Sequence, residues 1–321
     1  MSAQRLGLGC MGMSGMYGPA DRAESIATIH AAVDAGIDFL DTGDFYGMGH
    51  NELLIGEALK ELDRDRLTIS VKFGGMRDPG GGIVGYDGRP GAVKNFLSYT
   101  LTRLGLDHID VYRPARVDPQ VPIEETVGAI AEMVEAGYVR QVGLSEASAD
   151  TVRRAAAVHP IADLQIEYSL VSRGIEDAIL PACRELGIGI TAYGVLSRGL
   201  LSGHWRRERE LPPNDFRAHA PRFSEENLDR NLALADSLRE LADERGATTA
   251  QLAIAWVLAR GDDIMPLIGS RTRGQLEESL AALDVELSDD EVARIEAAVP
   301  ADAAAGERYN AQGMQTLDSE R

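Results

Sequence analysis

Residues 122–144, PIEETVGAIAEMVEAGYVRQVGL, contain the unit that decides the fold. Apolar side chains recur at helical spacing as far as Glu135, and Gly137 follows where a helix C-cap is expected. Residues 139–144 then have the apolar character of a buried strand, and residues 108–112 supply a similar strand before the helix. A strand, a helix and a second strand in this order predict a parallel βαβ unit.

The same alternation continues along the chain. Strand-like runs cover residues 6–10, 38–40, 67–71, 108–112, 139–144, 162–168, 188–193 and 264–269. Eight βα units predict an α/β fold of the closed (β/α)8 TIM barrel type, whose typical size is about 250 residues plus insertions. A doubly wound parallel sheet is the alternative. Because no linker rich in Pro, Gly and Ser divides the chain, we expect a single domain over residues 1–321.

Composition limits the classes of partner. The 32 basic and 51 acidic side chains give a net charge of −19, which argues against a broad surface for nucleic acid or anionic membranes. No segment approaches the ~20 apolar residues that cross a bilayer, and two cysteines are too few for a disulfide framework. These features predict a cytoplasmic globular protein that binds neither nucleic acid nor membranes. They leave the oligomeric state open.

Two insertions interrupt the regular βα count. Residues 74–91 are rich in glycine, and residues 202–227 carry several aromatic and proline residues. Both follow strand ends, on the face where barrel enzymes build their sites, so we expect them to cover a substrate. The tail, residues 301–321, is expected either to be flexible or to fold over the same mouth.

Polar residues at the strand ends are the candidates for chemistry. Asp41, Tyr46 and Lys72 follow the second and third predicted strands. An unpaired lysine at the end of an apolar strand is costly, and Asp41 is its natural partner. A cation beside Tyr46 is expected to lower the pKa of the phenol and to suit it for general acid–base catalysis. Each residue alone has an ordinary structural interpretation, but the three together favour a catalytic one.

The end of the last strand offers a second candidate site. Gly269-Ser-Arg271 leads into an amphipathic helix, and Arg273 follows it. A turn entering a helix presents backbone N–H groups that suit a phosphate. Spacing alone supports a phosphate site and an ordinary capped helix equally well.

These motifs, spread over nearly the whole chain, resemble the aldo-keto reductases. The resemblance rests on Leu40-Asp-Thr-Gly-Asp-Phe-Tyr-Gly, Asn51-Glu-Leu-Leu-Ile-Gly-Glu-Ala-Leu, Ser70-Val-Lys-Phe, Gly143-Leu-Ser, Gln165-Ile-Glu-Tyr and Ala192-Tyr-Gly-Val-Leu-Ser-Arg-Gly-Leu-Leu-Ser-Gly. It implies a barrel that binds NADP(H) in an extended pose. It also implies hydride transfer between nicotinamide and a carbonyl or alcohol carbon of a small molecule, such as an aldehyde, a ketone or a sugar.

The resemblance also implies residue roles. Asp41, Tyr46 and Lys72 match three members of a catalytic tetrad, with Tyr46 as the acid–base. The positions that match cofactor ligands are Ser145 and Gln165 for the carboxamide, Tyr193 for stacking on nicotinamide, Leu196, Arg198 and Leu200 for the pyrophosphate loop, Gly269, Ser270 and Arg271 for the 2′-phosphate, and Gln275 and Glu278 for the adenosine. Glu146 and Ser279 stand where the family usually carries Asn.

The fourth tetrad member is absent. The family pattern Asp-Leu-Tyr-Tyr-Gln-His-Arg-Val-Asp-Pro aligns with Asp110-Val-Tyr-Arg-Pro-Ala-Arg-Val-Asp-Pro119, so Ala115 occupies the histidine position. Arg113 also departs from the pattern, and we expect Arg113 and Ala115 to contact the substrate.

Three hypotheses follow from this gap. A neighbouring donor such as Arg113, Arg116 or His50 replaces the histidine; the space at Ala115 admits a bulkier substrate; or the chain binds NADPH as a sensor with vestigial reductase activity. The dispersed histidines lack the spacing of metal ligands, so no metal site is predicted.

Overall fold

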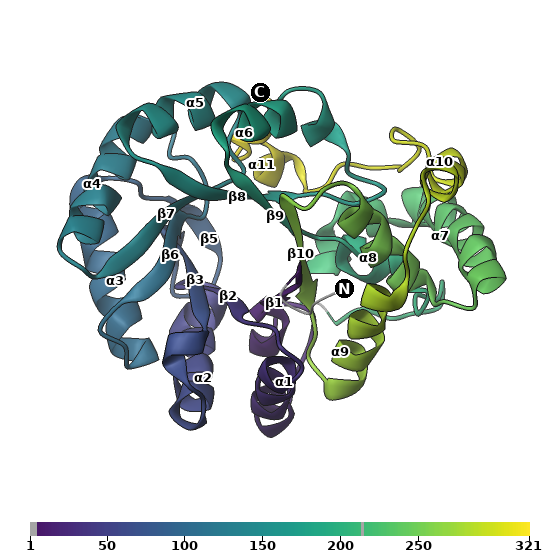
Figure 1. Cartoon of the computed structure of the whole chain (residues 1–321), viewed down its shortest axis with the longest axis horizontal. Helices are drawn as coiled ribbons and strands as arrows, with labels where there is room; N and C mark the ends of the chain where they lie inside the picture. Colours follow the sequence, from purple (N-terminus) through teal and green to yellow (C-terminus); the bar gives the residue numbers. More distant parts are fainter. Residues whose placement is uncertain (1–4, 213–214) are drawn as a thin grey trace.

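The computed structural model describes residues 5–212 and 215–321. Eight parallel strands close into a barrel in the order β1-β10-β9-β8-β7-β6-β3-β2, and helices surround it (Figure 1). The barrel strands are β1 (Gly7–Gly9), β2 (Phe39–Gly43), β3 (Thr68–Phe73), β6 (Ile109–Pro114), β7 (Val139–Ser145), β8 (Ile161–Glu167), β9 (Gly189–Tyr193) and β10 (Ile264–Gly269). The predicted TIM barrel is therefore confirmed, and the doubly wound alternative is wrong.

The helices pack around this barrel and enclose the core. They are α1 (Arg22–Asp34), α2 (His50–Ala58), α3 (Pro90–Leu104), α4 (Ile123–Glu135), α5 (Ala149–Val158), α6 (Ile179–Leu186), α7 (Glu225–Arg245), α8 (Thr249–Ala259), α9 (Arg273–Leu280), α10 (Asp289–Ala298) and α11 (Ala311–Met314). The main apolar cluster joins strand residues such as Leu8 and Val71 to helix residues such as Ile29 and Ile130. Gly137 follows α4 with a φ of 82°, the left-handed conformation predicted for it.

The first strand contains glycines at the spacing of a dinucleotide-binding motif, but they serve a different purpose here. Gly7, Gly9 and Gly12 have the spacing G-x-G-x-x-G, which in a doubly wound sheet would open a helix. In the structure Gly7 and Gly9 belong to β1, and a short 3-10 turn (Met11–Ser14) follows them. Leu267 and Phe39 side chains lie 3.0 Å from where a Cβ on Gly7 would sit, so this glycine serves barrel packing.

The two insertions follow barrel strands, and the tail follows α10. Residues 74–91 contain an antiparallel hairpin of β4 (Gly75–Arg77) and β5 (Ile83–Tyr86). Residues 202–227 form short 3-10 turns, Phe216–His219 and Pro221–Phe223, before α7; residues 213 and 214 lie outside the described residues. The C-terminal chain leaves α10 and returns to α11 close to β8 in the view of Figure 1. Its contacts with the loop between β7 and α5 hold it there: Asp318 Oδ2 accepts from Ser148 N at 2.8 Å, and Ser319 N donates to Glu146 O at 3.1 Å.

Candidate active site

Asp41 and Lys72 form a buried ion pair at the ends of β2 and β3. Strand pairing places Gly43 opposite Lys72, and the Lys72 ammonium contacts Asp41 Oδ1 directly. Asp41 Oδ2 also accepts from Ser70 Oγ at 2.9 Å and from Gln165 Nε2 at 2.8 Å. Burial lowers the pKa of Lys72, and the charge of Asp41 opposes that shift. Asp41 is therefore the counter-charge that offsets part of the cost of burying this ammonium.

Tyr46 lies beside this pair. It begins the 3-10 turn after β2, is buried, and its ring centroid is 5.0 Å from Lys72 Nζ. The prediction that its pKa is lowered is wrong. Burial, reinforced by the charge of Asp41, raises the pKa of Tyr46 well above its ordinary value. Because desolvation penalises the phenolate more than nearby cations favour it, Tyr46 is a protonated donor at neutral pH.

Arg113, at the end of β6, does not lie where we predicted it, in contact with the substrate. Arg113 is fully buried; its Nη1 donates to Asp163 Oδ2 at 2.9 Å and its Nη2 to Ser70 Oγ at 3.0 Å. The guanidinium is thus held below the mouth, where its charge is balanced by Asp163. It supports Ser70, and through it Asp41, and it is not presented to a substrate.

The structure shows which of the candidate donors lies near Ala115, the position of the missing histidine. Ala115 is buried, with its N–H donating to Phe73 O at 2.8 Å. His50, proposed above as a replacement donor, is exposed on α2, with Nδ1 2.9 Å from Ser14 Oγ. Arg116 instead folds back onto Ala115 and contacts Tyr309 of the tail. Of the three candidate donors, Arg116 is the one that the structure places at the mouth.

The predicted nicotinamide ligands lie together at the ends of β7, β8 and β9. Ser145 and Gln165 are paired neighbours in the sheet. Ser145 Oγ is buried and has no hydrogen-bond partner in the part of the chain that is described. Gln165 is turned toward Asp41, and Tyr193 Oη donates to Glu146 Oε1 at 2.8 Å.

A buried ionic network joins these strand ends to the tail. Glu146 accepts from Arg308 Nη2 and from Ser319 Oγ, at 2.8 and 2.6 Å. Burial alone would raise the pKa of Glu146, but Arg308 lowers it to about 2. Arg198, predicted for the pyrophosphate loop, pairs with Glu167 at 2.9 Å.

Sequence reasoning missed Arg308 and Tyr309. The signal that could have indicated them was Glu146 itself, since a carboxylate at the end of a buried strand requires a cation.

The remaining predicted cofactor residues lie after β9 and β10. Leu200 is buried and Leu196 partly buried in the turn after β9. Ser270 Oγ is buried and, among residues 5–212 and 215–321, has no hydrogen-bond partner. Arg271 Nη1 donates to the backbone oxygens of Tyr17 and Pro19, at 3.0 and 3.4 Å.

Some backbone donors at the helix start after β10 already have protein partners. The N–H groups of Arg271, Arg273 and Gln275 donate to side chains of Gln275, Glu24 and Thr272, so the free backbone donors predicted for this turn do not include these three. The Arg273 guanidinium pairs with Glu24, and Glu278 contacts His204 Nε2 at 3.0 Å.

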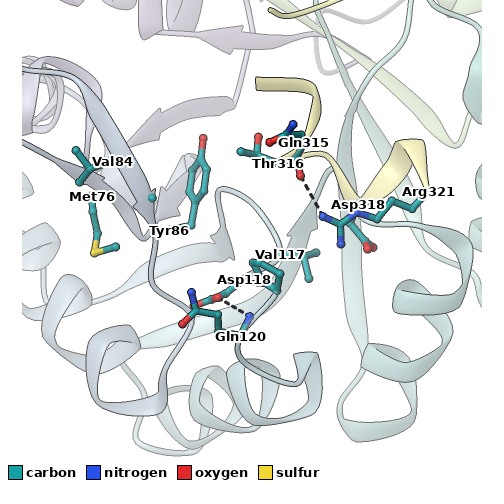
Figure 2. Close-up of a pocket in the computed structure, with 12 residues that line it drawn as sticks. Met76, Val84, Tyr86, Val117, Asp118, Gln120, Gln315, Thr316, Asp318 and Arg321 are labelled. Carbon is teal, nitrogen blue, oxygen red and sulfur yellow. Dashed lines mark hydrogen bonds between the residues drawn. The ribbon is translucent and has the colours of Figure 1, made fainter. Parts of the chain in front are cut away.

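A pocket of about 230 Å³ lies between the hairpin, the loop after β6 and the tail (Figure 2). Figure 2 shows Tyr86 of the hairpin on one side and Gln315 and Thr316 of the tail on the other, with Val117 and Asp118 after β6 between them. Both insertion and tail therefore shape the space next to the predicted site. Tyr46 and Lys72 are not among its lining residues.

Comparison with known proteins identifies the family. The model of the aldo/keto reductase family matches residues 5–300. The chain belongs to the aldo/keto reductase family. It is 45% identical over 306 residues to probable aldo-keto reductase 1 of Glycine max, covering 95% of this chain and 88% of that protein.

Two solved aldo/keto reductase structures share the architecture. The glycerol dehydrogenase of Gluconobacter oxydans has a TM-score of 0.83 and 32% identity, with 92% of each chain covered. The holo form of an aldo-keto reductase from Bacillus halodurans has a TM-score of 0.76 and 26% identity, with 94% of each chain covered. Family membership supports an oxidoreductase that acts on small carbonyl compounds with a nicotinamide cofactor.

The residues present fit such a cofactor. Two buried hydroxyls without partners, Ser145 Oγ and Ser270 Oγ, belong to the positions expected for the carboxamide and for the 2′-phosphate. Buried polar atoms in native proteins are normally hydrogen-bonded, so both hydroxyls are free to bond to atoms of a cofactor. Among the described residues, no group of three or more His, Cys, Asp or Glu could hold a metal ion, and no helix is long and apolar enough to cross a membrane.

Proposed function

We propose that this aldo/keto reductase is an NADP(H)-dependent oxidoreductase, acting on a carbonyl or alcohol carbon of a small molecule, with Tyr46 as general acid–base. The observation that carries this proposal is a buried, protonated Tyr46 next to the Lys72–Asp41 ion pair at the barrel mouth. We further propose that the chain acts as one domain in the cytoplasm, without nucleic-acid or membrane partners. The free, buried cysteines Cys10 and Cys183 and the net charge of −19 support that setting.

The protein side of the reaction follows from the electrostatics of the site. When bound, the nicotinamide would supply the hydride that reduces the carbonyl carbon. Tyr46 donates its phenolic proton to the carbonyl oxygen, and the ammonium of Lys72, whose Nζ lies 5.0 Å from the centroid of the Tyr46 ring, favours the phenolate that forms. Asp41 favours the charged form of Lys72, while Ser70 and Gln165 fix the orientation of Asp41. In the alcohol-oxidising direction the same groups accept the proton.

The preference for NADP(H) over NAD(H) is proposed from Ser270 and Arg271. Ser270 Oγ needs a partner, and among the described residues the Arg271 guanidinium contacts backbone oxygens but forms no ion pair. Burial and the charge of Arg217 lower the pKa of Arg271, which indicates a cation lacking a neutralising anion. A phosphate dianion at this place would satisfy both side chains.

The substrate class, a small aldehyde, ketone or sugar-like compound, is proposed from family membership and from a structural neighbour. The pocket of about 230 Å³ lies next to the proposed site and is not lined by Tyr46 or Lys72, so its volume does not set the size of the substrate. The Gluconobacter oxydans neighbour is a glycerol dehydrogenase, which supports small hydroxylated substrates.

The alternative is an NADPH-binding sensor with vestigial activity. Ala115 favours it, because losing one positioned donor costs about 10²–10³ in rate. The tail favours it as well, because Tyr309 contacts the side chain expected to stack on nicotinamide: its Oη lies 2.9 Å from Tyr193 Oη.

One experiment separates the two functions. Protein fluorescence is followed as NADPH is added, and absorbance at the nicotinamide band is then recorded with a panel of aldehydes, ketones and sugars. We expect turnover that Tyr46→Phe reduces by about 10³ or more, and Tyr138→Phe, an exposed tyrosine, serves as the matched control. Binding of NADPH without turnover on any compound would instead establish the sensor.

A further inference from the structure

The vacated histidine position lacks a side-chain donor, and a second residue can supply one. We propose that Arg116, held in place by Tyr309 of the C-terminal tail, binds the substrate oxygen in place of the missing histidine. This inference rests on the proposed function. The family pattern also carries an arginine after the histidine, so what distinguishes this chain is that the arginine stands next to Ala115.

The path of the Arg116 side chain supports this role. Its Nη1 donates to Ala115 O at 2.6 Å, so the guanidinium curls back over the residue that replaces histidine. Its Nη2 donates to Tyr309 Oη at 3.3 Å. The Tyr309 hydroxyl in turn lies 2.9 Å from that of Tyr193, the residue predicted to stack on nicotinamide. The guanidinium is therefore tethered between the end of β6 and the predicted nicotinamide position.

Two aromatic rings hold the guanidinium from either side of the mouth. The Arg116 guanidinium carbon is 6.0 Å from the ring centroid of Tyr86 in the hairpin and 5.7 Å from that of Tyr309 in the tail. Both contacts are cation–π interactions, which orient a guanidinium without neutralising it. The hairpin insertion and the tail thus both help to position this one side chain.

The charge of Arg116 remains available to a ligand. Arg113, Arg198 and Arg308 each pair with a carboxylate. Within residues 5–212 and 215–321, Arg116 forms no ion pair, and its guanidinium hydrogen bonds go to the neutral oxygens Ala115 O and Tyr309 Oη. A guanidinium has five N–H donors and stays protonated, so donors remain for a carbonyl or alkoxide oxygen.

Arg116 is also electrostatically close to the proton donor. Burial and the charge of Asp41 raise the pKa of Tyr46, and the charge of Arg116 acts against them. In reduction, a guanidinium N–H would donate to the carbonyl oxygen and withdraw electrons from the C=O bond. The hydride then adds to carbon, and the proton that neutralises oxygen comes from Tyr46, so Arg116 is unchanged at the end.

The test combines loss and replacement of the donor. Arg116→Ala is expected to lower kcat/KM by about 10² while leaving the Kd for NADPH within about twofold, and Arg116→Lys to retain more activity than Arg116→Ala. Introducing the family histidine, Ala115→His, into Arg116→Ala should recover at least about tenfold of that loss. Arg89→Ala, an exposed arginine whose side chain is 73% accessible, is the matched control.

The pH profile provides a readout that a purely structural role would not move. Removing the positive charge of Arg116 should shift the alkaline limb of kcat to higher pH, because that charge lowers the pKa of Tyr46. An Arg116→Ala enzyme within about twofold of wild type, with Tyr46→Phe still inactive, would overturn this inference alone. No rescue by Ala115→His, or equal losses of activity, NADPH binding and thermal stability in both Arg116 variants, would also overturn it. A wild-type protein that never turns over would remove the proposed function and this inference together.

Discussion

At the residue scale, the proposed chemistry depends on how burial shifts the pKa of each ionisable group. Tyr46 and Lys72 are both buried, and desolvation is the largest influence on each, raising the pKa of the phenol and lowering that of the amine. Asp41 favours the protonated form of both groups. The site is therefore set for donating a proton, and removing one from Tyr46 requires more alkaline conditions.

A pH prediction follows for carbonyl reduction. Because the folded pKa of Tyr46 lies well above its ordinary value of 10.0, the donor form persists throughout neutral and mildly alkaline pH. We expect kcat for reduction to stay level from about pH 6 to pH 9 and to fall only above that range. Steady-state rates across this range in constant ionic strength would check it. A fall in kcat centred near pH 7 would show that a different group controls the step.

Cofactor choice is the second prediction at this scale. Ser270→Ala and Arg271→Ala should each weaken NADPH binding by about 10- to 100-fold, the cost of a charge-assisted hydrogen bond, while NADH binding stays unchanged. Arg273→Ala is the control, because Arg273 pairs with Glu24 instead. Fluorescence titration with both cofactors measures the effect. Equal weakening for NADPH and NADH would contradict a 2′-phosphate site.

At the scale of elements, the tail is secured by one buried ionic network. Arg308 pairs with Glu146, just after β7, and approaches Glu167, the last residue of β8, at 2.8 and 3.6 Å. Arg222 of the second insertion also reaches Glu167, at 3.3 Å. The second insertion and the tail, which the sequence indicates only as irregular segments, are thus ion-paired to the strand ends that carry the predicted nicotinamide ligands.

The tail should therefore loosen when this network loses its charge. We expect Glu146→Gln to destabilise the protein by about 1–3 kcal/mol and to speed amide exchange in residues 301–321. Glu124→Gln, an exposed partner of Arg154, is the control and should change both quantities little. Urea unfolding and hydrogen-exchange mass spectrometry give the two readouts. Unchanged exchange in the tail would mean that other contacts hold it.

The same pair makes tail attachment sensitive to acid. The folded pKa of Glu146 is about 2, below its ordinary value of 4.5. The stability it contributes is thus complete above about pH 4.5 and is lost as pH falls toward 2. Exchange in residues 301–321 should rise in that window in the wild type and rise less in Glu146→Gln. A tail equally protected at pH 2.5 and pH 6 would disprove the linkage.

At the scale of the whole molecule, closure of the barrel couples distant parts of the chain. β1 pairs with both β2 and β10, so the first and last βα units share one sheet. Cys10 lies after β1 and Cys183 in α6; both are buried, and burial raises the pKa of each thiol to about 12. Neither thiol should be reactive while the barrel is intact.

Thiol labelling therefore reports on global unfolding. We expect no reaction of the native protein with a thiol reagent near pH 8, and reaction of both cysteines over the same range of denaturant concentration. Mass spectrometry of labelled peptides distinguishes Cys10 from Cys183. Labelling of one thiol well before the other would show that the barrel opens in separate parts.

Local pattern alone determined the barrel and the meeting of the three residues that we propose as catalytic. Apolar runs separated by amphipathic helices require parallel strands, and eight of them close a barrel, so Asp41, Tyr46 and Lys72 had to meet at one mouth. Only the tertiary structure decided the charges within that mouth. Desolvation reversed the predicted pKa shift of Tyr46, Asp163 drew Arg113 below the site, and the tail brought Arg308 and Tyr309 to strand ends more than 100 residues earlier in the chain. Burial and long-range ion pairing depend on the whole packed molecule, which residue spacing does not encode.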